Sequence, residues 1–160
     1  MYSLNVDSQH LNFSAAHFIT FAGKCERLHG HNYAVGVYLE GGLTEDDYVY
    51  DFVELKKKVK ALCDTLDHKF LLPTENPQFQ VTFADGEVEI RVHERRYVFP
   101  ERDVQVVPVS NITAECLAKY LAGELLRELT DSETLSVVQV SVEEAPGQAA
   151  SFRIENGQRG

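Results

Sequence analysis

The sequence predicts an α+β protein in which two helices pack on one face of an antiparallel β-sheet. Three observations indicate this class: apolar residues alternate near both ends of the chain, two central segments repeat apolar residues at three- and four-residue steps, and a hairpin pattern lies between those segments. With 160 residues, 44% of them hydrophobic, the chain has enough apolar material for one packed core. We therefore expect a single domain over residues 1–160.

Two strands are expected near the N-terminus. Residues 2–18 alternate, with Phe13, Ala15 and His17 on one side of the chain. Residues 30–40 are rich in Tyr and Val, which favour strands, and follow a glycine-containing loop. If the two strands pair as a hairpin, the end of the first lies beside the start of the second.

Two amphipathic helices are expected in the middle of the chain. Asp51 is a residue type that caps helices, and the apolar stripe after it consists of Phe52, Leu55, Val59, Leu62 and Leu66. The second helix is expected from about Thr113, its N-cap, and its apolar stripe consists of Leu117, Leu121, Leu125 and Leu129.

A hairpin is expected between the helices, around Asp85-Gly86. A two-residue turn there would pair three sets of apolar residues on one face: Phe83 with Val88, Val81 with Ile90, and Phe79 with Val92. Further short strands are expected at 97–99 and 104–107. The chain then ends with strands over 135–144 and 150–155, separated by a Pro-Gly turn.

Composition excludes several classes of function. A formal net charge of −10 argues against nucleic-acid binding, because neutralising phosphates requires a basic surface. An anionic ligand would need a local basic patch, for which Lys24, Arg27 and Lys69 are the candidates. No stretch of about 20 apolar residues exists to span a membrane, and the N-terminus lacks the pattern of a secretory signal, so we expect a cytoplasmic protein. The 3 cysteines form no CxxC pair, which argues against a disulfide framework.

Three histidines form a candidate metal site. In an extended chain His29 and His31 project to the same side, with Cβ atoms about 6.6 Å apart. His17 would be the third ligand if the first two strands pair. Three neutral imidazoles suit a zinc ion (Zn²⁺), and a free fourth position would make the site catalytic. The spacing of His29 and His31 alone also suits two ordinary surface histidines.

A cysteine lies close to this candidate site. Cys25 precedes His29 by four residues and is flanked by Lys24 and Arg27, and neighbouring cations favour the reactive thiolate. Alternatively, Cys25 is a fourth zinc ligand that closes the shell and removes catalysis at the metal.

Acidic and histidine side chains elsewhere are further candidates. Asp67 and His68 at the end of the first helix could act together in proton transfer, or His68 could simply complement the helix C-terminus. Glu144 continues the parity of an apolar strand face, and a carboxylate there requires partners, so it is a candidate ligand-binding residue. Alternatively, the strand ends before Glu144.

Three segments in combination, 13–17, 25–33 and 66–69, resemble the 6-pyruvoyltetrahydropterin synthase and 6-carboxytetrahydropterin synthase family. The resemblance covers nearly the whole chain except about residues 72–108, which we expect to be a hairpin insertion. It implies the tunnelling fold (T-fold), with element order ββααββ, and a ring-like homohexamer.

The resemblance also implies roles for the candidate residues. Zinc would be bound by His17, His29 and His31. The catalytic residues would be Cys25 as the proton-transferring thiol, Asp67 and His68 as a relay, and Glu144, which would also anchor the pterin. The substrate of this family is a small pterin, 7,8-dihydroneopterin triphosphate.

The short spacer between Cys25 and His29 resembles the bacterial 6-carboxytetrahydropterin synthases of queuosine biosynthesis, whereas the pyruvoyl synthases have a longer spacer. We therefore expect 6-carboxy-5,6,7,8-tetrahydropterin as product, with loss of triphosphate and acetaldehyde. The insertion, Ile112 in place of a Pro and Ala145 in place of a Thr depart from the family pattern. The alternatives are the pyruvoyl synthase reaction, which eliminates triphosphate only, and a non-catalytic zinc- or pterin-binding module.

Overall fold

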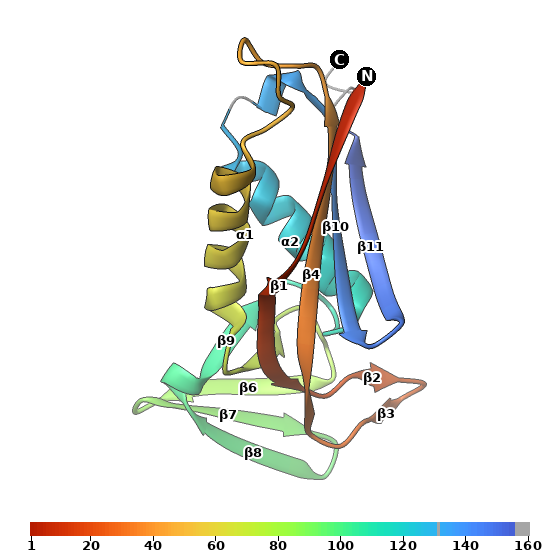
Figure 1. Ribbon diagram of the computed structural model, residues 1–160. Coiled ribbons are helices and arrows are strands. Elements are labelled where there is room, and N and C mark those ends of the chain that lie inside the picture. The colour runs from red at the N-terminus through yellow and green to blue at the C-terminus, as the bar shows by residue number, and fades with distance from the viewer. Residues whose placement is uncertain (131, 156–160) are drawn as a thin grey trace.

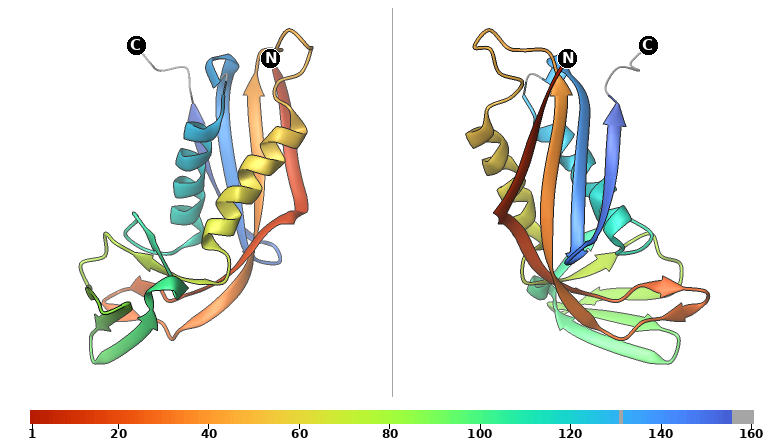
Figure 2. Two further views of the ribbon diagram at one scale, coloured as in Figure 1. Left: turned by 90° about the vertical axis from the view of Figure 1, so that its left-hand side faces the viewer. Right: turned by 45° about the vertical axis from the view of Figure 1, so that its right-hand side comes forward.

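The computed structural model describes residues 1–130 and 132–155, and its central feature is a six-stranded sheet (Figure 1). Its strands are β1 (Tyr2–His17), β4 (His29–Gly41), β5 (Lys69–Pro73), β9 (Val104–Val107), β10 (Leu135–Ala145) and β11 (Gln148–Glu155). They are ordered β11-β10-β4-β1-β5-β9. Both helices lie on one face of this sheet, as Figure 2 shows. The predicted α+β class is confirmed.

The sheet is antiparallel over four strands and mixed at one edge. β11, β10, β4 and β1 pair antiparallel in turn, whereas β5 pairs parallel with both β1 and β9. Parallel neighbours need a long crossover connection, because the chain must return to its starting end before it pairs. The segment between β5 and β9, which contains the predicted insertion, supplies that crossover.

The helices begin at the predicted caps and bury the predicted stripes. In α1 (Phe52–Leu66) the Asp51 carboxylate accepts from the backbone N–H of Glu54, and in α2 (Ala114–Glu128) the Thr113 hydroxyl accepts from Cys116. The core residues on these helices include Leu55, Val59, Leu66, Leu117, Leu121 and Leu125. Phe52, the first residue of the predicted stripe, is instead 53% exposed. No helix in the described parts of the chain is long and apolar enough to span a membrane.

The insertion forms a separate three-stranded antiparallel sheet of β6 (Phe79–Ala84), β7 (Glu87–Val92) and β8 (Arg95–Pro100). The three predicted pairings across the Asp85-Gly86 turn are confirmed. On the predicted common face Phe79, Val88, Ile90 and Val92 are buried and Val81 is partly buried, whereas Phe83 at the turn is 51% exposed.

A second hydrophobic core lies between this sheet and the end of the main sheet. It consists of Phe18, Phe70, Leu72, Phe79, Val88, Ile90 and Val92. Cys25 packs against this second core from a short hairpin formed by β2 (Thr20–Phe21) and β3 (Lys24–Cys25). The insertion therefore stabilises the loop that carries the predicted thiol.

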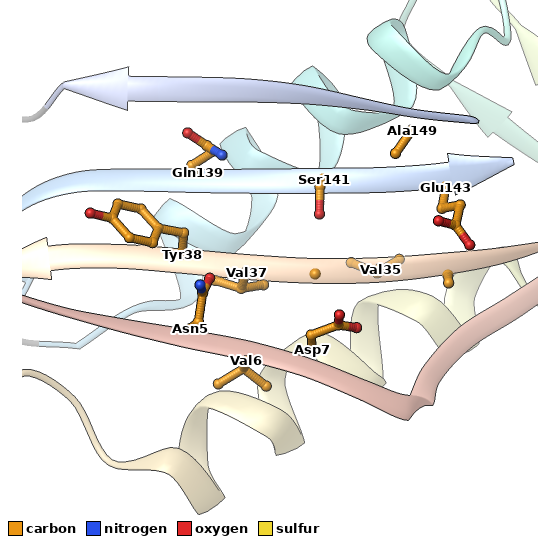
Figure 3. A pocket seen from close by; sticks show the side chains of 12 residues that line it. Asn5, Val6, Asp7, Val35, Val37, Tyr38, Gln139, Ser141, Glu143 and Ala149 are labelled. Carbon is orange, nitrogen blue, oxygen red and sulfur yellow. The ribbon is translucent and has the colours of Figure 1, made fainter. Parts of the chain in front are cut away.

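The sheet face that the helices leave uncovered carries a polar hollow of about 450 Å³ (Figure 3). Side chains from β1, β4 and β10 line it, including Asp7, Tyr38 and Ser141. Glu143 lines the hollow, but neither Glu144 nor the predicted histidines do. The hollow is thus distinct from the predicted metal site.

Candidate metal centre and active site

Three histidines from two paired strands converge at one end of the main sheet. His17 ends β1 directly opposite His29 at the start of β4, and His31 lies two residues further along β4. The Nε2 atoms of His17 and His29 are 3.2 Å apart. Glu144 on β10 adds a carboxylate, and the four potential ligand atoms all lie within 4.8 Å of one another. This group, called the metal group below, could hold one metal ion.

Hydrogen bonds behind the rings fit metal binding. The Nδ1 atom of His17 lies 2.8 Å from the carbonyl oxygen of Ile112, and that of His29 lies 2.8 Å from the carbonyl oxygen of Arg27. A neutral imidazole that donates from Nδ1 to a carbonyl has a lone pair on Nε2, the atom that faces the group. The rings are therefore held in the tautomer that a metal ligand requires.

The Nε2 atom of His31 is the clearest sign of a missing partner. It is buried and makes no hydrogen bond with any described residue. The Oε1 atom of Glu144 lies 2.8 Å from this nitrogen, but the two atoms form no hydrogen bond. A metal ion at this position would accept the lone pair of this nitrogen and balance the charge of the nearby carboxylate.

Burial keeps His17 neutral. Its side chain is 1% exposed, and desolvation lowers its pKa below the ordinary value; the neighbouring imidazoles add to this, whereas the Ile112 carbonyl and Glu144 oppose it. A metal ligand must be unprotonated, so this environment favours metal binding near neutral pH.

Gly30 allows the two strands to approach closely between His29 and His31. A Cβ atom at this position would lie 3.0 Å from the carbonyl oxygen of Ala15 on β1. Because that oxygen belongs to the backbone of the paired strand, any larger residue would shift β4 and its histidines. Close packing against β1 thus explains why a glycine stands between the two histidines.

Glu144 lies at the edge of the metal group, where strand parity predicts a carboxylate among apolar neighbours. Its side chain is 29% exposed, and Oε1 is 3.8 Å from Nε2 of His17. The alternative that the strand ends before Glu144 is wrong, because β10 continues to Ala145. Val138, Val140 and Val142 are buried as predicted.

The thiol of Cys25 is half-buried on the loop whose next residue, Glu26, approaches His29, and it is not one of the four ligand atoms of the metal group. Burial raises its pKa, the Glu26 carboxylate adds to this, and the Arg95 guanidinium opposes it. Lys24 and Arg27, expected to supply the cation, are exposed. The cation that acts on the thiol comes from the insertion, 70 residues away in sequence.

Asp67 and His68 form the predicted pair and are not among the ligand residues of the metal group. Oδ2 of Asp67 is 2.9 Å from Nδ1 of His68, and Oδ1 accepts from the backbone N–H of Ser14. The imidazole of His68 is 83% exposed, with a left-handed backbone (φ 56°). It borders an open depression that is also lined by Asn32 and by His31 of the metal group. His68 thus shares a depression with one metal-group histidine, but it is not one of the four clustered ligand residues.

Lys69, the third residue expected in a basic patch, donates from Nζ to the carbonyl of Arg102. It lines the same depression as His68. Lys24 and Arg27 lie on the exposed thiol loop instead, so the three cations do not form one patch around the metal group.

Glu26 is a site residue that the sequence analysis missed. Its Oε2 atom lies 3.9 Å from Nε2 of His29, and its side chain is 31% exposed. The signal was present, because an acidic residue three positions before the first histidine of an HxH pair can turn back toward the same site. Only the loop conformation shows that it does so.

The site residues lie within a region that is similar to a known protein family. The profile of the 6-pyruvoyl tetrahydropterin synthase family matches residues 8–155, which include the metal group, Cys25, Asp67 and His68. The chain belongs to the 6-pyruvoyltetrahydropterin synthase family. A Methanocaldococcus jannaschii protein, named as a candidate 6-carboxy-5,6,7,8-tetrahydropterin synthase, is 35% identical over 156 residues and 96% of each chain.

Solved structures of 6-pyruvoyltetrahydropterin synthases agree with the fold. The Plasmodium vivax enzyme matches with a TM-score of 0.91 and 33% identity over 96% of this chain and 98% of that one. That enzyme has also been solved as a mutant in which a catalytic glutamate is replaced by alanine. A Pyrococcus furiosus dihydroneopterin monophosphate aldolase is 40% identical over 60 residues, covering 38% of this chain and 51% of that one. The predicted T-fold and family are thus confirmed.

Proposed function

We propose that this chain is a zinc-dependent lyase that converts 7,8-dihydroneopterin triphosphate to 6-carboxy-5,6,7,8-tetrahydropterin, with loss of triphosphate and acetaldehyde. The observation that carries this proposal is the convergence of His17, His29 and His31 beside the loop that bears Cys25 and Glu26. The short spacer from Cys25 to His29 and the name of the Methanocaldococcus relative favour the carboxy product.

Three imidazoles, two of them supported by backbone carbonyls, suit zinc among the biological metals. When bound, zinc supplies Lewis acidity, which lowers the pKa of hydroxyl groups in contact with it. His17, His29 and His31 would hold it.

Glu144 is proposed as the pterin anchor. With a metal bound, Nε2 of His31 carries no proton, so this nitrogen has no hydrogen to offer the carboxylate. The two oxygens of Glu144 can then accept two parallel N–H bonds from the amino-pyrimidinone edge of a pterin. Partial exposure of this side chain leaves room for that approach.

Proton transfer is assigned in this proposal to Cys25 and Glu26. The raised pKa of Cys25 keeps the thiol protonated at neutral pH, so it can donate a proton to a carbanion-like centre. Asp67 holds His68 as a proton shuttle, but His68 is not one of the clustered ligand residues of its own chain. In the homohexamer that the family resemblance implies, this pair would serve the site of a neighbouring copy.

The deciding experiment is incubation of the zinc-loaded protein with 7,8-dihydroneopterin triphosphate, followed by mass spectrometry of the products. The expected products are 6-carboxytetrahydropterin, triphosphate and acetaldehyde, and Cys25→Ala is expected to abolish their formation while zinc remains bound. Cys116→Ala, on α2, is the matched control and should retain activity. A 6-pyruvoyl product would establish the alternative reaction, and zinc binding without any product would establish a binding module.

Glu26 supports a second candidate function, aldol cleavage of the side chain of a phosphorylated dihydroneopterin. Its carboxylate lies 3.9 Å from Nε2 of His29, where it could accept a proton from a substrate hydroxyl. The Pyrococcus relative is named an aldolase of this class, and the Plasmodium enzyme has a catalytic glutamate. Release of a two-carbon aldehyde phosphate from dihydroneopterin monophosphate, lost in Glu26→Gln and retained in Cys25→Ala, would establish this activity.

A further inference from the structure

The insertion reaches the thiol loop through one arginine. Arg95, the first residue of β8, donates from Nη1 to the carbonyl of Glu26 at 2.8 Å and from Nη2 to the carbonyl of Cys25. One planar guanidinium thus binds two consecutive carbonyls. These are the backbone groups of the two residues proposed to move protons.

The guanidinium is itself fixed by the second core. Nη1 of Arg95 also lies 3.3 Å from the hydroxyl of Tyr97, and the Tyr97 ring is 5.1 Å from that of Phe18 and 6.2 Å from that of Phe99. Aromatic packing of this kind restricts the rotamers of the tyrosine, which in turn holds the arginine. The arginine therefore connects a rigid layer to an otherwise short and exposed loop.

The other strand of the thiol loop has a separate anchor. Asn111 accepts from the backbone N–H of Thr20 at 3.2 Å and donates to its carbonyl at 2.8 Å, and Thr20 pairs with Cys25 across β2 and β3. The loop is thus bound on one strand by Asn111 and on the other by Arg95. The backbone N–H of Glu26 also donates to the carbonyl of Ile19 at 2.9 Å, whereas Arg95 binds the carbonyls of both Cys25 and Glu26 through one side chain.

We propose that Arg95 is a positioning residue that fixes the backbone of Cys25 and Glu26 in the loop beside His29, so that the insertion contributes to the site. A guanidinium presents paired N–H donors in a fixed fork, whereas a lysine ammonium acts as a single mobile point charge. The proposal rests on the proposed function in that it takes Cys25 to be the reacting thiol.

Electrostatics point the same way. The positive charge of Arg95 lowers the pKa of Cys25, opposing burial and the Glu26 carboxylate, which both raise it. Arg95 therefore affects both the position of the Cys25 thiol and its pKa. A change in the reactivity of this thiol can be measured without substrate.

The test compares Arg95→Met, Arg95→Lys and the control Arg96→Ala. Arg96 is the next residue along β8, is 56% exposed and pairs with Glu89 on the surface of the insertion. Three quantities are measured: zinc content, kcat and KM of the lyase, and the rate of Cys25 alkylation by iodoacetamide from pH 6 to about 10 with peptide mapping. Mapping separates Cys25 from Cys63 and Cys116.

In Arg95→Met, kcat is expected to fall roughly 100-fold with zinc content unchanged, because small displacements of reacting groups have effects of this size. KM should change little, and the alkylation profile should move to higher pH. Arg95→Lys should recover part of the alkylation shift but little of kcat, because it keeps the charge and loses the fork. Arg96→Ala should match the unmodified chain in all three.

The proposal is overturned if Arg95→Met retains the original kcat and alkylation profile, or if Arg95→Lys restores both in full. If Arg95→Met does not fold, the kcat and the alkylation profile of Arg95→Lys provide the test. If the unmodified chain forms no product, the proposed function fails, and the alkylation profiles still decide whether Arg95 positions the thiol.

Discussion

His17 and His29 face each other at the last pair of the β1–β4 ladder, with their Nε2 atoms 3.2 Å apart. Two protonated imidazoles at this separation would repel strongly, and His17 is too buried for water to screen that repulsion. The close pair therefore fits a neutral His17 or a metal ion between the two nitrogens.

The first prediction concerns the stability of the metal-free protein at low pH. The pKa of His17 is lowered on folding, so below its ordinary value of 6.5 the unfolded chain binds more protons than the folded one. The free energy of unfolding should therefore be fully present above pH 6.5 and decrease as the pH falls toward the lowered pKa. Each tenfold decrease in proton affinity corresponds to about 1.4 kcal/mol.

Urea denaturation of the protein, after a chelator has removed any metal, measures this effect between pH 7.5 and about 5. His17→Gln should flatten the dependence. His93→Asn is the control, because His93 is exposed and left-handed (φ 53°), a conformation that Asn tolerates. An unchanged pH dependence in His17→Gln would contradict the assignment.

The second prediction concerns Gly30. Gly30→Ala should weaken zinc binding about 10- to 100-fold, the effect typical of disturbed support around metal ligands, because its Cβ would press on the Ala15 carbonyl. Gly42→Ala is the matched control, since a Cβ there meets no atom within 4 Å. Competition with a chelator of known zinc affinity measures both. Equal affinities in the two variants would show that close strand approach is unimportant.

The third prediction separates the two possible roles of Glu144. Glu144→Gln should keep one zinc per chain and raise KM about 10- to 100-fold, because charged hydrogen bonds to the pterin are lost. Metal analysis and steady-state kinetics on the same preparation provide the comparison. Loss of zinc from this variant would instead make Glu144 a fourth ligand.

The fourth prediction tests whether His68 serves a neighbouring copy. Cys25→Ala and His68→Ala should each be inactive alone, but coexpression should restore activity in about a quarter of the sites by random assortment in a shared-site oligomer. Cys25→Ala coexpressed with the Cys25→Ala/His68→Ala double variant is the control and should stay inactive. No recovery in the first mixture would place the relay within one chain or remove it.

Local patterns predicted much of the fold. The helix caps at Asp51 and Thr113, and the register across Asp85-Gly86, follow from short-range chemistry, and the structure confirms all three. The parallel pairing of β5 with β1 and β9 has no comparable signal, because it depends on where the crossover returns. The buried run at 70–72 therefore carried no sign of its partners.

The candidate site, like the fold, could be predicted where its signals are local in the sequence and not where its contacts are between distant segments. Residue type and spacing brought together His17, His29 and His31 and identified the parity of Glu144. Arg95 could not be found in this way, because its partners are backbone carbonyls about 70 residues earlier, and carbonyls have no sequence signature.

The metal group and the thiol loop are supported by different cores. The histidines belong to strands of the main sheet, whereas Cys25 packs on the second core that the insertion completes. Substitutions in the insertion therefore act first on the second core and the thiol loop, whereas the histidines are held by the strand pairing of the main sheet. A lineage can vary the surroundings of the thiol in this way while it inherits the three histidines unchanged.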